Sequence, residues 1–224
     1  GADGPVACVR GGSVQFDGIS FEGGRGESGR GASVQDGAAR FTACRFVGNV
    51  GGASAVEARV RFEGCDFVGN RAGIEGGALQ SERSEVRLEG CTVRDNAAGT
   101  FGGGVSARMG SVELLDTKVR ANRVVSGAWG GGVYAEGAEV RMQGGCVEAN
   151  ASAESGAGVY MLGGQGLLAV AFGFLFLFEP FLLLIQPRGV VALPGHALAP
   201  IELQNPLGDI VEEVPIVGDG HHRA

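Results

Sequence analysis

The segment VRFEGCDF, from Val60 to Phe67, is one of six in this chain that align with one another residue for residue. The other five are VQFDGISF from Val14, ARFTACRF from Ala39, VRLEGCTV from Val86, VELLDTKV from Val112 and VRMQGGCV from Val140. Their first residues lie 25, 21, 26, 26 and 28 positions apart, a period typical of solenoids and β-helices. Apolar and polar residues alternate until a step such as Glu63-Gly64, which indicates a strand, a corner and a second strand. The sequence therefore predicts an all-β parallel β-helix solenoid of about six coils within residues 1–166.

Alignment of the segments produces columns of equivalent residues, which a β-helix stacks about 4.8 Å apart. Three columns are apolar throughout and are expected to face inward: Val14, Ala39, Val60, Val86, Val112 and Val140; Phe16, Phe41, Phe62, Leu88, Leu114 and Met142; Phe21, Phe46, Phe67, Val93, Val119 and Val147. A further inward column is small and rich in cysteine: Ile19, Cys44, Cys65, Cys91, Thr117 and Gly145.

The column of cysteines predicts free thiols rather than disulfides. Side chains of one column run parallel, which leaves their Cβ atoms farther apart than a relaxed disulfide allows. We therefore expect Cys44, Cys65 and Cys91 to be buried and to pack as small hydrophobic residues. Cys146 falls one position later, in an outward column, and is a candidate for an exposed thiol. Cys8 precedes the first aligned segment and has no place in the alignment.

Each of the last five coils closes with an asparagine at the same place: Asn49, Asn70, Asn96, Asn122 and Asn150. Asparagine tolerates left-handed backbone angles, which suits a tight corner, and stacked amides can bond to one another along the axis. We expect a structural ladder rather than five ligand-binding amides. A loop of variable length follows each asparagine and ends in a glycine-rich step such as Gly76–Leu79, so length varies on one side of the coil only.

Two signatures in these repeats, FxxN and GGA followed by an aliphatic residue, resemble the repeats of chlamydial polymorphic outer membrane proteins and their relatives in bacteria and algae. The match is literal at Phe46–Asn49, Phe67–Asn70 and Gly76–Leu79, is relaxed elsewhere, and covers about residues 11–162. The resemblance implies a right-handed parallel β-helix that is displayed outside the cytoplasm and used for adhesion or as a scaffold.

The composition changes sharply after the repeats. Residues 167–185 are nineteen positions with one charge, Glu179, followed by Pro180. As a helix they would extend about 28 Å, close to the hydrocarbon thickness of a bilayer, so a membrane-spanning helix is the leading interpretation. The alternative is a hydrophobic helix that caps the open end of the solenoid. In a span, Glu179 would need a protein partner and Pro180 would kink the helix, which favours packing within a complex.

Residues 186–224 are rich in Pro and Gly and read as an extended tail, whose scattered apolar residues favour contact with a partner. Arg188 follows the apolar segment, which places the C-terminal side in the cytoplasm or stroma and the β-helix on the extracellular or lumenal side. The chain begins at Gly1 without a basic or apolar leader, so we expect that a targeting segment has been removed or that the chain is a fragment.

Charge and side-chain placement restrict the function classes. A net charge of −7 argues against nucleic acid as a partner. Arg40, Arg61, Arg87 and Arg141 share an outward row, but Glu63 and Glu89 in the neighbouring row are expected to neutralise it. Phe101 and Trp129 precede equivalent glycine steps on consecutive coils, so we expect them to stack on one another as a small contact patch or to pack against their loops.

The leading functional hypothesis is a non-enzymatic, membrane-attached β-helix that acts as a structural or accessory subunit of a membrane protein complex. The alternative is a cell-surface adhesion or glycan-binding module that uses the variable loops and Trp129. A polysaccharide-cleaving enzyme is a weaker third hypothesis, because such β-helices gather acidic residues on one strand face and Asp66, Asp95 and Asp116 fall in different columns. We expect no cofactor and no metal, since the histidines lie in the tail and no paired-cysteine spacing occurs.

Overall fold

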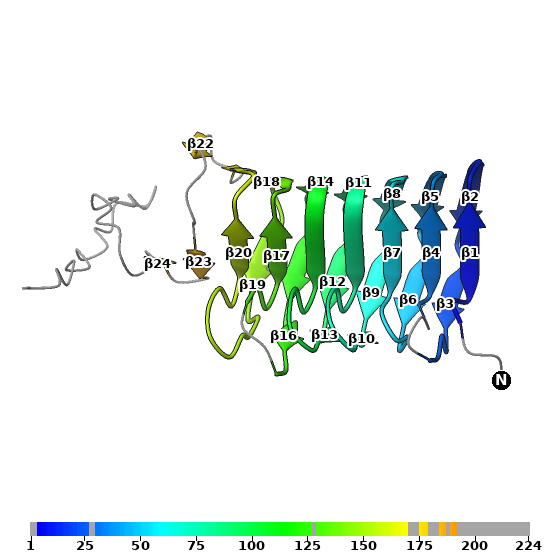
Figure 1. Ribbon diagram of the computed structural model, residues 1–224, viewed down its shortest axis with the longest axis horizontal. Coiled ribbons are helices and arrows are strands. Elements are labelled where there is room, and N and C mark those ends of the chain that lie inside the picture. The colour runs from blue at the N-terminus through cyan, green and yellow to red at the C-terminus, as the bar shows by residue number, and fades with distance from the viewer. Residues whose placement is uncertain are drawn as a thin grey trace, which may run out of the picture. The chain divides into compact units, whose positions relative to one another are not determined.

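A computed structural model describes residues 4–26, 30–126 and 129–167, together with the backbone of 168–169, 175–178, 184–186 and 189–191. Figure 1 shows the coils of the β-helix side by side, from β1 to β20. Every strand pair from β1 to β21 is parallel, as a solenoid requires, and no helix occurs in the described residues. The predicted all-β parallel β-helix of about six coils is confirmed.

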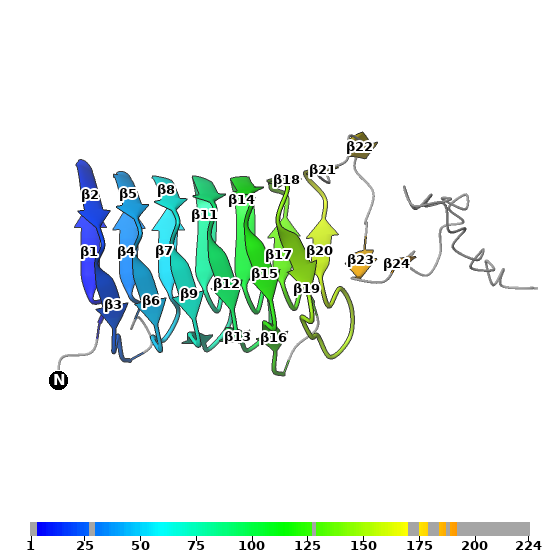
Figure 2. The same ribbon diagram turned by 180° about the vertical axis from the view of Figure 1, so that it is seen from behind.

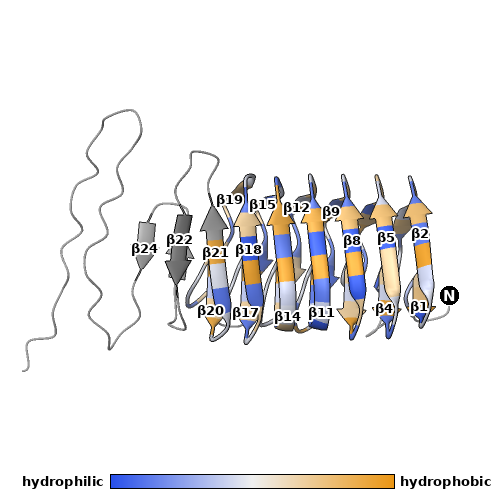
Figure 3. Cartoon of the chain, turned by 90° about the horizontal axis from the view of Figure 1, so that it is seen from above, coloured by the Kyte–Doolittle hydropathy of each residue, from blue (hydrophilic) through white to orange (hydrophobic). Residues whose placement is uncertain are grey.

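The largest sheet forms two legs of each coil. The first leg comprises β1 (Ala7–Arg10), β4 (Ala32–Gln35), β7 (Ala53–Val56), β17 (Val133–Glu136) and β20 (Val159–Leu162). The second leg comprises β2 (Ser13–Asp17), β5 (Ala38–Thr42), β8 (Arg59–Glu63), β18 (Glu139–Gln143) and β21 (Gln165–Ala169). In two coils the legs are continuous, as β11 (Leu79–Glu89) and β14 (Val105–Leu115). Figure 3 shows alternating hydrophilic and hydrophobic bands along β8, β11 and β14.

Two smaller sheets complete the coil, as Figure 2 shows from behind. One contains β3 (Ser20–Glu22), β6 (Arg45–Val47), β9 (Asp66–Val68), β12 (Thr92–Arg94), β15 (Lys118–Arg120) and β19 (Cys146–Glu148). The other is short and contains β10 (Arg71–Ala72), β13 (Ala97–Ala98) and β16 (Arg123–Val124). The variable loops lie on the side of β10, β13 and β16, so their length does not disturb the larger sheets.

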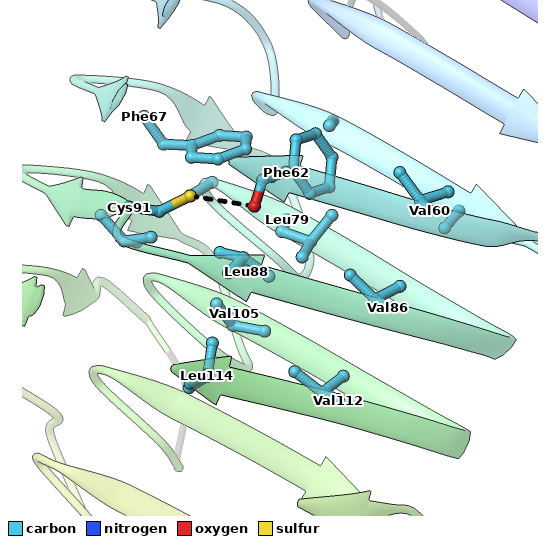
Figure 4. Close-up of a cluster of buried hydrophobic side chains, with 14 of the residues drawn as sticks. Val60, Phe62, Phe67, Leu79, Val86, Leu88, Cys91, Val105, Val112 and Leu114 are labelled. Atoms are coloured by element: carbon cyan, nitrogen blue, oxygen red, sulfur yellow. Dashed lines mark hydrogen bonds between the residues drawn. The ribbon is translucent and has the colours of Figure 1, made fainter. Parts of the chain in front are cut away.

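The register of the strands reproduces the predicted columns. Val60 pairs with Ala39 on one side and Val86 on the other, and Phe62 with Phe41 and Leu88. Phenylalanines of one column stack along the axis, with ring centroids of Phe41 and Phe62 4.9 Å apart, and the two columns meet edge to face. Figure 4 shows Val60, Phe62 and Phe67 and their equivalents Val86 and Leu88 as part of one cluster of buried side chains. Two members of the small inward column differ: Gly145 is exposed, and Ile19 is 42% exposed, because no described coil stacks over the first one.

Left-handed residues turn the chain at each corner. The predicted glycine steps are confirmed, with φ of 57° at Gly64 and 60° at Gly90, and Ala43 takes this conformation where the segment has no glycine. The role given to the asparagines was wrong in one respect. The left-handed residue is the one before each asparagine, such as Gly69 before Asn70, and the asparagine contributes its side chain instead.

The five asparagines form the predicted ladder inside the coil. Asn96 Nδ2 donates to Asn122 Oδ1 at 2.9 Å and to Phe67 O at 3.0 Å, while Asn96 Oδ1 accepts from the backbone N–H and the side-chain amide of Asn70. The same pattern repeats from Asn49 to Asn150. Because each amide satisfies buried groups of two neighbouring coils, a shift of one coil on the next would leave several of them unpaired.

The apolar segment 167–185 is not helical where it is described. Its described residues belong to β21, β22 (Leu175–Phe178) and β23 (Leu184–Gln186), and β24 (Gly189–Val191) follows. β22 pairs antiparallel with β21, and β23 pairs antiparallel with β20. In the described part of the chain no helix is long and apolar enough to cross a membrane. The rest of the predicted span, including Glu179 and Pro180, and residues 192–224 of the predicted tail lie outside the described residues.

Replacement of Asn96 by alanine is expected to lower the free energy of unfolding by about 3 kcal/mol or more, because it removes the four buried hydrogen bonds of the Asn96 side chain. Asn150→Ala is the control. Asn150 is 8% exposed and bonds to Asn122 and Val119, so its loss should cost less. Chemical denaturation of both variants measures the difference between their free energies of unfolding. Equal losses of stability would contradict a ladder in which each inner asparagine bonds to the asparagines of both neighbouring coils.

Two buried serines of β11 should respond oppositely to the same substitution. Ser81 Oγ has no hydrogen-bond partner among the described residues, so Ser81→Ala should raise the free energy of unfolding by about 1 kcal/mol. Ser84 Oγ accepts from the Ala58 N–H at 3.0 Å and donates to Glu82 O at 2.8 Å, so Ser84→Ala should lower it by about 1–2 kcal/mol. Thermal unfolding of both variants measures these changes in stability. Destabilisation by Ser81→Ala would contradict the prediction, because it would mean that the Ser81 hydroxyl has a hydrogen-bond partner in solution.

Candidate partner-contact site

The loops after the asparagines fold back over the outer face of the first leg. Four loop residues on consecutive coils are joined by parallel β-bridges: Glu75, Phe101, Trp129 and Ser155. Each stands directly before the left-handed glycine of the glycine step. A Cβ at Gly102 would lie 2.3 Å from Val105 O, so glycine is required where the loop passes this close to the strand. The glycine steps thus fix the position of the loop ladder over the sheet.

Four aromatic rings gather beneath and within this ladder. Phe101 and Trp129 contact one another as predicted, with ring centroids 5.7 Å apart. Tyr134 and Tyr160, from the outward column of the first leg, lie under them and stack at 5.9 Å. Trp129 also stacks on Tyr160, at 5.3 Å and an interplanar angle of 8°. Because Trp129 has Phe101 on one side and Tyr160 on another, the indole is engaged within the protein rather than presented as a free stacking platform.

The two tyrosines were missed by sequence reasoning. Their signal was the column Gln80, Ser106, Tyr134 and Tyr160, which becomes visible only when the residues after each glycine step are aligned as a further strand. Although this column points outward, Tyr134 is 2% exposed because the loops cover it. Burial, together with the nearby Glu136 carboxylate, raises the pKa of Tyr134 to about 12.

A polar network extends the cluster along the same face. Glu75 accepts from Gln80 Nε2 at 2.8 Å and from the Ser106 hydroxyl at 3.1 Å. Arg108 Nε lies 3.2 Å from carboxylate oxygens of both Glu75 and Glu136, and its guanidinium lies over the Phe101 ring at 5.4 Å. Glu136 in turn accepts from the Tyr134 hydroxyl at 3.1 Å. The network ties the loops to the strands across several coils.

The outward arginine row is neutralised as predicted. Arg40 lies 2.6 Å from Glu63, and Arg87 lies 3.0 Å from Glu89 and 3.4 Å from Glu113. Arg141 pairs with Glu113 and Glu139. An open groove of about 450 Å³ runs over these rows, lined by β2, β5, β8, β11 and β14. Since its arginines are paired with carboxylates, the groove offers no excess of positive charge to a polyanion.

The cysteines are placed largely as predicted. Cys44, Cys65 and Cys91 are buried and free, and each thiol donates to a backbone carbonyl, as Cys91 does to Phe62 O in Figure 4. Burial raises the pKa of Cys44 and that of Cys146. Cys146 is only half-buried, whereas Cys8, which the alignment could not place, is exposed on β1 beside Ser33.

Within the described residues, no group of three or more His, Cys, Asp or Glu side chains could hold a metal ion. Comparison with protein-family models, with curated proteins and with solved structures finds no match to this chain. The site is therefore characterised by its own geometry: a covered aromatic cluster and a network of ion pairs and hydrogen bonds on the outer face of a β-helix.

The thiols should differ in reactivity by their burial. In the native protein we expect a maleimide or disulfide reagent to label Cys8 rapidly and Cys146 slowly. Because the pKa of Cys146 is raised, its labelling rate should keep increasing with pH beyond the pH at which the rate of a free cysteine levels off. Cys44, Cys65 and Cys91 should react only after denaturation, when all five thiols are counted. Mass spectrometry of labelled peptides gives the order; fast native labelling of Cys65 would contradict its burial.

Proposed function

We propose that this chain is a non-enzymatic structural or accessory subunit of a membrane protein complex, in which the β-helix is a rigid body held through the apolar segment 167–185. The observation that carries the proposal is the place of that segment. It begins within β21, on the last described coil, so a contact made by it is coupled directly to the β-helix without a flexible linker. Nineteen residues with a single charge are costly to expose to water and favour contact with lipid or with a partner protein.

The chemistry of the outer face supports a role without catalysis. Polysaccharide cleavage needs a carboxylic acid whose pKa is raised so that it can donate a proton. On the second leg the bond from Arg59 lowers the pKa of Glu85 instead, and Glu63, Glu89 and Glu113 are paired with arginines. The glycan-binding alternative receives less support, because stacking on a sugar needs a free aromatic face and the Trp129 ring is packed between Phe101 and Tyr160.

The test compares two leucine-to-arginine variants in the organism's own membranes. Leu177→Arg places a charge within the apolar segment, whereas Leu162→Arg places it on a side chain of β20 that is already 43% exposed. We expect the native chain and Leu162→Arg to be extracted only by detergent and to co-migrate with a large assembly, and Leu177→Arg to be released. Mass spectrometry of the co-migrating proteins names the complex.

Two outcomes would contradict the proposal. One is a native chain that is recovered from the soluble fraction without detergent, as a species containing no other protein. The other is cleavage of polysaccharides by the purified chain, measured as released reducing sugar, with loss of this activity in the Glu85→Gln or Glu113→Gln variant. A detergent-extracted chain that travels without other proteins would instead support the surface-module alternative.

A further inference from the structure

The short sheet of β10, β13 and β16 ends at β10, although the first and second coils of the β-helix continue beyond it (Figure 1). The reason is the loop that follows Asn49. Only Val50 separates Asn49 from the glycine step at Gly51, whereas five residues, Arg71–Glu75, precede Gly76 in the next coil. The second coil therefore supplies no strand beside Arg71–Glu75, and we call this position the missing rung.

Two backbone N–H groups point toward the missing rung. One coil later, Gly99 donates to Ala72 O, so the equivalent residue Gly73 directs its N–H toward the second coil. Glu75, the equivalent of Phe101, does the same. Neither N–H has a backbone partner among the described residues. Gly73 is exposed, and a Cβ on it would meet no atom within 4 Å, so the space at this edge is open.

Two exposed arginines flank the short loop. Arg25, Val50 and Arg71 occupy one row on consecutive coils, because Val50 donates to Gly24 O and Arg71 donates to Asn49 O. Among the described residues, neither arginine side chain has a carboxylate partner. The missing rung thus lies between two positive charges that the described part of the chain does not neutralise.

A third arginine crosses the short loop. Arg30 Nη2 donates to Gln80 Oε1, and a Cβ on Gly51 would lie 2.7 Å from Arg30 Nη1, so the guanidinium lies against Gly51. Arg30 Nη1 is buried and has no hydrogen-bond partner among the described residues. Burial lowers the pKa of Arg30, against the opposing effect of the Glu75 carboxylate. A guanidinium that has lost water without gaining a full set of partners favours an added anionic group.

We infer that the missing rung binds an acidic, extended segment of a partner protein, which adds to β10 as the next strand. Neighbouring strands lie about 4.8 Å apart, so one omitted rung leaves the width of one strand. Carbonyl groups of the segment accept from the N–H groups of Gly73 and Glu75, as in other cases of strand addition to a sheet edge. Its carboxylates pair with Arg25, Arg30 and Arg71.

Charge selects the acidic segment over other extended segments. A neutral or basic segment could make the same backbone bonds, but it would leave the three arginines unpaired or repel them. Ile74, which is 68% exposed beside Gly73, adds apolar surface for one side chain of the segment. The inference does not rest on residues 167–185, so its failure would leave the proposed subunit role untouched.

Fluorescence anisotropy of the full chain in mild detergent tests the site. The probe is a short labelled peptide in which valine alternates with glutamate, and the control peptide carries lysine in place of glutamate. We expect only the acidic peptide to bind. Gly73→Pro removes an N–H at the missing rung and should raise the dissociation constant on the order of tenfold or more, whereas Gly73→Ala keeps the N–H and should leave it unchanged.

Two further variants test charge and space. Arg71→Glu should also raise the dissociation constant on the order of tenfold or more, whereas Arg120→Glu, at an exposed residue of β15, should not. A copy of residues 71–75 inserted after Val50 supplies the missing rung within the chain and should abolish binding of the peptide. Circular dichroism and thermal unfolding confirm that each variant is folded.

Equal binding of the two peptides would overturn the inference. So would an affinity for the acidic peptide that Gly73→Pro and Arg71→Glu leave unchanged. If inorganic phosphate displaces the acidic peptide and itself binds equally well to Gly73→Pro, the site takes a small anion instead, and the inference is likewise overturned.

Discussion

Hydrogen bonding between successive coils, locked in register by the asparagine ladder, is the interaction on which the rest of this structure depends. Backbone bonds alone would permit a coil to slide by two residues along its neighbour, since strand pairing repeats with that period. The amide of Asn70 removes this freedom, because it satisfies Phe46 O of the coil before and bonds to Asn96 of the coil after. Once the asparagines are aligned, each phenylalanine meets its equivalent, and each glycine step is placed under its loop.

A consequence is that core and surface are specified separately. Val60, Phe62 and Phe67 pair with the apolar residues Val86, Leu88 and Val93 of the next coil, because a polar side chain in these columns would be buried between two neighbouring coils. Loops after the asparagines are free of this constraint and vary in length. Where they fold back, they bury Tyr134 and Tyr160 against Phe101 and Trp129, which forms a second apolar cluster outside the coil. The surface that a partner meets is therefore set by the loops and by the ends of the solenoid.

Much of the fold could be predicted from the sequence, because period-two alternation and an asparagine ten positions after the first residue of each of the last five segments are local signals. The first leg was not predicted as a strand: Ala53, Ser54 and Ala55 are small and show no alternation, although all three are buried. The left-handed corner was assigned to the asparagines because the residue type allows it, whereas Gly48 and Ala121 adopt it in fact. Hydropathy alone cannot distinguish a helix from strands over residues 167–185, since both bury apolar side chains.

Hydrogen exchange of the asparagine side-chain amides, followed by NMR on a ¹⁵N-labelled sample, tests the central claim most directly. In the ladder both Nδ2 protons of Asn49, Asn70, Asn96 and Asn122 are bonded, one to a backbone carbonyl and one to the next asparagine. The account predicts that they exchange as slowly as the backbone amides of the core strands. Exchange as fast as that of the exposed Gln143 side chain would show that the amides are solvated and that the coils are held in register by other means.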